Sequence, residues 1–227
     1  MSDLLLLARS PRRGAAAILA HGRLGTAVGL VLVATAVAAV NAARFAADVP
    51  VSSVLFGDTR SPAIATLIDS LGRDRAAIVA YLIQQSWTAV VVATALSPLL
   101  VWLLGASAVQ AAARLDGARR PFMPILILLG YATALTRVPA DGAAALLGSG
   151  QAAGAQVAQL IGTAGLIWLG AIAWRAIELH YGLTARRALI VLLIAVVVFY
   201  LVPLVLIVAS VFVLIIAAIV LEYVPGR

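Results

Sequence analysis

The 227-residue sequence contains no cysteine and no lysine, and only 11% of its residues are charged. Without cysteine there are no disulfides and no thiolate metal ligands. A soluble domain carries about 25% charged residues. Because this chain carries so few, we expect most of its side chains to face lipid or other apolar side chains.

Sequence motifs that mark catalytic or cofactor sites are also missing. The chain has no HExxH, no GxSxG, no P-loop and no dinucleotide fingerprint. Its two histidines, His21 and His180, lie in different segments without the spacing of metal ligands. We therefore expect no metal and no cofactor, and we expect a protein that is not an enzyme.

Long apolar runs are what the chain does have. Residues 188–221 include no charged side chain. As a helix they would extend roughly 51 Å, well beyond a bilayer core of roughly 30 Å. Pro203 lies near the middle of this run. One helix kinked at Pro203 is favoured over a hairpin of two half-spans, because no turn-forming residue flanks the proline.

Five apolar runs occur in all, at about 24–43, 78–109, 122–136, 157–179 and 188–221. They predict an all-α, polytopic helical membrane bundle that forms a single integral membrane domain over residues 1–227. The first run is longer than the roughly 7–15 residues of a signal-peptide core, so we interpret it as a genuine span.

The arginines predict an orientation. Before the first run lie Arg9, Arg12, Arg13 and Arg23. Because short cytoplasmic loops carry an excess of basic residues, the N-terminus is expected in the cytoplasm, under a cytoplasmic (inner) membrane. Five crossings then place the C-terminus outside. In the outer loop 44–75, Ser61-Pro62 begins an amphipathic pattern that predicts a short surface helix ending near Gly72.

Ionisable residues within membrane spans are costly and are therefore functional candidates. Arg137 is expected at the outer end of the third span, and Asp141 is expected to cap a short helix after Pro139. At the inner end of the fourth span, Arg175 and Glu178 share one helix face, next to His180. Either these groups lie at the interface and pair locally, or they line a hydrophilic cavity. The other candidate cavity residues are Asn41, Gln84, Gln85, Thr88 and Tyr131.

Residues 106–198 resemble the Yip1 family of small multispan membrane proteins. The resemblance lies in the loop Ala112-Ala113-Arg114-Leu115-Asp116-Gly117, in Gly130-Tyr131-Ala132 followed by Pro139, and in His180-Tyr181-Gly182-Leu183-Thr184. It implies five spans and a cytoplasmic N-terminus. Only about 23 residues precede the first span, so the role of eukaryotic members with Rab GTPases is not implied for this chain, which is similar to a prokaryotic member.

These patterns favour a membrane scaffold that binds protein partners or lipids. A transporter or lipid-handling protein with a polar cavity between spans is the alternative, and an intramembrane enzyme is the least favoured class. The expected partners are membrane lipids, a second copy of the chain or other membrane proteins. Nucleic acid is not expected, because the arginines are spread over several loops. The candidates for binding anionic lipids are Arg114, Arg119, Arg120, Arg186 and Arg187.

Overall fold

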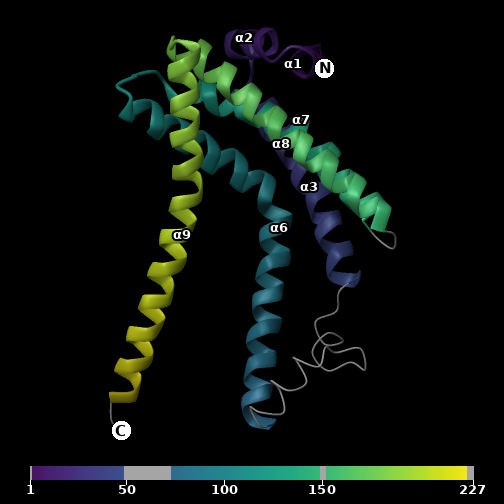
Figure 1. Cartoon of the computed structure of the whole chain (residues 1–227), viewed down its shortest axis with the longest axis vertical. Coiled ribbons are helices and arrows are strands. Elements are labelled where there is room, and N and C mark those ends of the chain that lie inside the picture. The colour runs from purple at the N-terminus through teal and green to yellow at the C-terminus, as the bar shows by residue number, and fades with distance from the viewer. Residues whose placement is uncertain (1, 49–72, 149–151, 224–227) are drawn as a thin grey trace.

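The computed structural model describes residues 2–48, 73–148 and 152–223, and this part of the chain is helical throughout except for short connections. Figure 1 shows the helices. They are α1 (Ser2–Arg9), α2 (Pro11–His21), α3 (Leu24–Asp48), α6 (Arg73–Leu115), α7 (Phe122–Leu147), α8 (Ala152–Tyr181) and α9 (Ala185–Tyr223).

Five of these helices are long and apolar enough to cross a membrane. The candidate spans are Leu24–Ala47, Gln84–Leu115, Phe122–Leu147, Ala153–Tyr181 and Ala185–Val205. The predicted all-α helical bundle is therefore confirmed. The surface helix expected within the outer loop lies outside the described residues.

Helix α7 is the centre of the bundle and contacts α1, α2, α3, α6 and α8. One close crossing is at Gly130, where an added Cβ would stand 2.9 Å from the Cβ of Ala27 and 3.1 Å from Nε1 of Trp102. Trp102 Nε1 donates a 2.7 Å hydrogen bond to the Leu126 carbonyl of α7. A small residue at this crossing lets three helices approach closely, as is common between membrane helices.

The packing of α3 differs from one expectation. Gly25 and Gly29 form a GxxxG pair that predicts a close helix contact, yet among the described residues no atom lies within 4 Å of where their Cβ atoms would stand. The prediction is wrong within this chain. The buried stripe of α3 is formed by alanine and valine on the other face, at Ala27, Val31, Ala34, Ala38 and Ala42.

Helices α1 and α2 lie across one end of the bundle (Figure 1). Leu7 of α1 is fully buried, and it packs directly against Gly14 of α2. A Cβ at Gly14 would meet the Leu7 Cα at 2.3 Å. Helix α2 also packs on α7 and α8, which fixes the N-terminal pair to the bundle.

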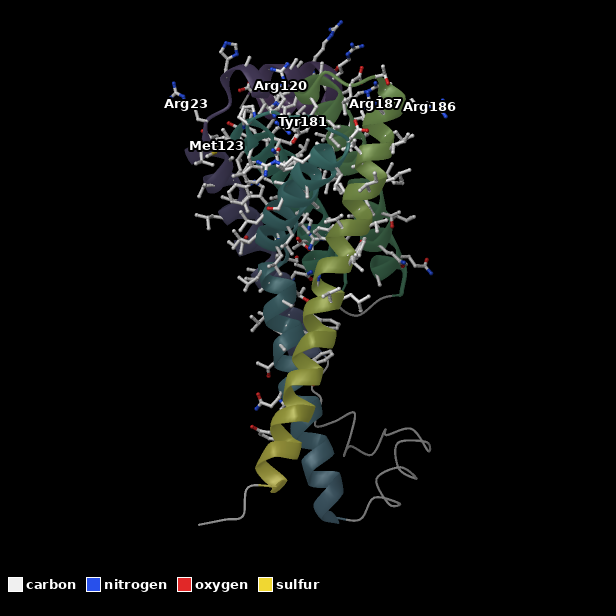
Figure 2. The ribbon with its side chains drawn as sticks, turned by 90° about the vertical axis from the view of Figure 1, so that its left-hand side faces the viewer. Arg23, Arg120, Met123, Tyr181, Arg186 and Arg187 are labelled. Atoms are coloured by element: carbon white, nitrogen blue, oxygen red, sulfur yellow. The ribbon has the colours of Figure 1, made fainter. Side chains whose placement is uncertain are left out.

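Two prolines lie inside long helices. Pro203 is interior to α9, so the prediction of one continuous helix is confirmed and the hairpin is excluded. Pro98 is interior to α6, which changes direction partway along its length (Figure 1). An interior proline removes one backbone hydrogen bond and commonly bends a helix. Both views show α6 and α9 extending beyond the other helices (Figures 1 and 2).

The expected end of the third span is wrong. Helix α7 continues through Pro139 to Leu147, so Asp141 lies within the helix and caps nothing. Its carboxylate instead pairs with Arg137 one turn earlier, at 3.3 Å between Asp141 Oδ1 and Arg137 Nη2. An i,i+4 pair of this kind stabilises a helix across the turn that contains the proline.

Candidate functional site

The end of the bundle that carries α1 and α2 is rich in arginine. Arg23, Arg120, Arg186 and Arg187 all lie there (Figure 2). We call this end the arginine face and define it by the arginines of α1 and α2, of the α2–α3 and α6–α7 connections, of the last turn of α6 and of the first turn of α9. They are Arg9, Arg12, Arg13, Arg23, Arg114, Arg119, Arg120, Arg186 and Arg187.

The arginine face has an open hollow between its loops. Arg114, Arg119, Arg120 and Pro121 line a depression of about 540 Å³. All five arginines expected to bind anionic lipids are exposed. Arg187 differs from the other four because its Nη2 lies 3.1 Å from Asp116 Oδ2. That ion pair ties the start of α9 to the loop after α6.

Polar contacts beneath the arginine face hold the loops in place. Tyr181 donates a 2.5 Å hydrogen bond to Gln110 Oε1, and Gln110 Nε2 donates to the Arg120 carbonyl at 3.1 Å. His180 Nε2 lies 2.9 Å from the Pro121 carbonyl oxygen. The loop between α6 and α7 is therefore fastened to α6 and α8, and His180 is a structural contact in this arrangement.

Arg175 and Glu178 form the local pair that their spacing predicts. Arg175 Nη1 lies 2.6 Å from Glu178 Oε2, and its guanidinium stacks over the Trp174 ring with 4.1 Å between the guanidinium carbon and the ring centroid. Arg12 of α2 approaches the other carboxylate oxygen at 3.8 Å. Glu178 thus connects α8 to the N-terminal helix pair.

A second polar site lies in the other half of the bundle. A cavity of about 500 Å³ is lined by residues from four helices, and we call it the polar cavity. Arg137 Nη2 donates a 2.6 Å hydrogen bond to Ser97 Oγ of α6 and pairs with Asp141. Arg44 of α3 donates to the Ala145 carbonyl. The polar residues of the lining are Asn41, Arg44, Thr94, Arg137, Asp141 and Gln159.

The structure brings some predicted residues together and separates others. Asn41, Arg137 and Asp141 share the polar cavity. Ten further residues of α7 follow Arg137, so the helix does not end there. The convergence expected of three α6 residues with Arg137 is wrong, because they are exposed and do not line the cavity. They are Gln84, Gln85 and Thr88. Tyr131 belongs to the apolar core.

Sequence reasoning missed several residues of these sites. Arg44 and Gln159 line the polar cavity, and Gln110 and Asp116 bind the loops of the arginine face. Arg44 falls in the expected outer loop 44–75, yet it belongs to α3. The signal in the sequence is the apolar stretch 45–47, which continues the first apolar run beyond Arg44.

The bundle also contains an apolar cavity. It measures about 240 Å³ and lies between α6, α7, α8 and α9. Its lining includes Val109, Leu129, Leu169, Leu192 and Phe199. In a bilayer such a space suits an acyl chain or an apolar side chain of a neighbouring helix.

Comparison with known proteins finds no match among protein families, curated proteins or solved structures. The class therefore follows from the structure. The five apolar helices make this chain a multi-pass, helical integral membrane protein. In the part of the chain that the structure describes, the arginine face and the polar cavity each bring together polar groups from several helices.

Proposed function

We propose that the chain is a Yip1-like, non-enzymatic scaffold of the cytoplasmic membrane that binds anionic lipids through its arginine face, with its N-terminus in the cytoplasm. The observation that supports this proposal is the uneven distribution of charged residues between the arginine face and the rest of the chain. The arginine face and Arg175 together hold ten arginines against three acidic residues, Asp3, Asp116 and Glu178. The remaining six arginines are matched by six acidic residues. The full net charge of +7 therefore belongs to one end.

Three glycines of the motifs that resemble the Yip1 family lie where the backbone conformation or the helix packing favours glycine, and this supports the assignment. Gly117 and Gly182 have φ angles of +86° and +68°, a region that favours glycine. Gly117 ends α6, and Gly182 ends α8. Gly130 lies at a close crossing of α3, α6 and α7. Each of the three motifs therefore contains a glycine that the backbone or the packing of this structure requires. The resemblance to the family is one of sequence.

Native mass spectrometry tests lipid binding at the arginine face. A basic residue near an anionic surface contributes about 1 kcal/mol. Changing both Arg119→Gln and Arg120→Gln is therefore expected to weaken retention of cardiolipin or phosphatidylglycerol roughly 30-fold. The matched control is Arg73→Gln with Arg75→Gln at the other end of α6, which removes the same charge. Equal lipid loss from both pairs, or none from either, would contradict the proposal.

The polar cavity favours a second candidate, a protein that handles polar solutes or lipid headgroups across part of the membrane. Proteoliposomes containing the protein should then scramble labelled phosphatidylglycerol faster than protein-free vesicles, and Arg137→Gln should abolish the increase. Scrambling at the protein-free rate would exclude this candidate and leave the scaffold proposal unaffected.

A further inference from the structure

We propose that the polar cavity is a binding site for a small anion that also carries a hydroxyl donor, of the phosphoglycerol type. This deepens the second candidate function by naming its ligand. Equilibrium binding is measured separately from scrambling, so a protein that binds without scrambling would keep this proposal and exclude that candidate.

The charges of the lining call for a negatively charged ligand. The lining contains two guanidinium groups, those of Arg44 and Arg137, and one carboxylate, that of Asp141. It therefore carries one excess positive charge. Arg137 is occupied by Ser97 and Asp141. Arg44 uses one nitrogen on the Ala145 carbonyl, and its planar guanidinium has further N–H donors. Guanidinium groups suit phosphate and carboxylate oxygens.

Two buried atoms call for a ligand that both donates and accepts. Within the described part of the chain, Asp141 Oδ2 and Arg137 Nε have no hydrogen-bond partner, and the Asp141 side chain is only 8% exposed. Leaving a buried polar atom unpaired destabilises the folded protein. A hydroxyl of the ligand would satisfy Asp141 Oδ2, and an oxygen acceptor would satisfy Arg137 Nε.

The size of the cavity fits such a molecule. At about 500 Å³, it falls within the range of roughly 300–1,000 Å³ that is usual for ligand pockets. A single bridging water, with a share of about 30 Å³, would leave most of it empty. The same chemistry could arrive as free glycerol 3-phosphate or as the headgroup of phosphatidylglycerol.

The test is the saturable shift in melting temperature of the full chain in detergent, with glycerol 3-phosphate as the probe. Sulfate carries charge without a donor and glycerol carries donors without charge, so both should bind at least tenfold more weakly. Arg44→Gln and Asp141→Asn should each weaken binding at least tenfold, while Arg186→Gln on the arginine face should not. Should Asp141→Asn fail to fold, Gln159→Ala is the milder variant, expected to weaken binding several-fold.

A second arm uses dihexanoyl phosphatidylglycerol to separate the two sources. Tighter binding than glycerol 3-phosphate, lost with Arg44→Gln, assigns the site to a lipid headgroup. Weaker binding assigns it to the free phosphate. The proposal is overturned if neither probe shifts the melting temperature. It is equally overturned if sulfate matches glycerol 3-phosphate, or if Arg119→Gln with Arg120→Gln removes the binding while Arg44→Gln does not.

Discussion

Glu178 forms an ion pair with Arg175, with 2.6 Å between Glu178 Oε2 and Arg175 Nη1. Its other carboxylate oxygen lies 3.8 Å from Arg12 Nη2. Its side chain is 16% exposed and that of Arg175 is 32% exposed, so water screens the pair only in part. A single charged residue can in this way connect two helices, here α8 and α2. The apolar periodicity of each helix does not predict such a connection.

A double-mutant cycle on Arg175→Ala and Glu178→Ala should reveal coupling of about 0.5–1 kcal/mol. Removing one partner leaves an uncompensated charge in a partly desolvated site, so each single change should cost more than its share of the double change. The measurement is the free energy of unfolding in mixed detergent micelles. The control cycle pairs Glu178→Ala with Arg186→Ala, and it should show no coupling. Zero coupling in the first cycle would contradict the pairing.

Gly130 sets the distance between α3, α6 and α7. Gly130→Ala places a methyl 2.9 Å from the Ala27 Cβ, so helices must shift, at a cost of about 1–3 kcal/mol typical of overpacking. We expect a lower melting temperature in detergent. Gly25→Ala is the matched control, because nothing lies within 4 Å of its Cβ position. Equal behaviour of the two variants would show that the crossing tolerates a methyl.

At the scale of elements, α1 and α2 behave as one unit that caps the bundle. Leu7 and Gly14 meet backbone to backbone, and a backbone contact cannot be relieved by turning a side chain. The position of α1 therefore depends on the absence of a side chain at residue 14.

Gly14→Ala is expected to separate α1 from α2, because the new Cβ would overlap the Leu7 Cα at 2.3 Å. Limited trypsin digestion should then cleave at Arg9, Arg12 or Arg13 several-fold faster than in the unchanged protein. Ala16, exposed on the same helix, provides the control as Ala16→Ser, which should be cleaved at the original rate. Unchanged cleavage of Gly14→Ala would show that the helix pair accommodates the methyl.

Helix α9 is longer than a membrane crossing requires. Its 39 residues extend about 58 Å, against a core of roughly 30 Å, and tilt absorbs only part of the difference. The candidate span ends at Val205, while the apolar sequence runs on to Leu221. An apolar surface of that length in water would favour association.

Truncation after Val211 is therefore expected to cause aggregation or to change the oligomeric state in detergent, because we expect the apolar segment that is removed to pack against a partner, such as a second copy. Size-exclusion chromatography with light scattering measures the outcome. Removal of residues 224–227 alone is the control, since it leaves all of α9. A truncated protein that stays monodisperse, with the same mass and melting temperature, would show that the segment is dispensable.

At the scale of the whole molecule, the concentration of net charge at one end predicts the orientation. Arginine-rich ends remain on the cytoplasmic side during insertion. The arginine face, with the N-terminus, should therefore face the cytoplasm.

The absence of native cysteine makes the orientation directly testable. With an impermeant thiol reagent on intact cells, Asp58→Cys should be labelled, and Ser2→Cys should be labelled only after permeabilisation. Labelling of Ser2→Cys but not Asp58→Cys in intact cells would reverse the orientation and would move the arginine face away from the cytoplasmic lipids.

The sequence by itself determined the membrane class, the five spans and the continuity of α9 through Pro203. These properties depend on local apolar length, which a bilayer reads segment by segment. The pair Arg175 and Glu178 was also predictable, because residues three apart share one helix face. The end of the third span was not, since whether a proline ends a membrane helix depends on the polar contacts around it, here those of Arg137 and Asp141.

Only the tertiary structure decided which polar residues meet. The polar cavity joins Asn41 and Arg44 of α3, Thr94 of α6, Arg137 and Asp141 of α7 and Gln159 of α8. Apolar periodicity gives each helix a face but not a neighbour, a rotation or a depth. Close crossings such as Gly130 against Ala27 set the neighbour, the rotation and the depth of each helix. The fit of small side chains at these crossings thereby decides which polar groups of the four helices lie next to one another.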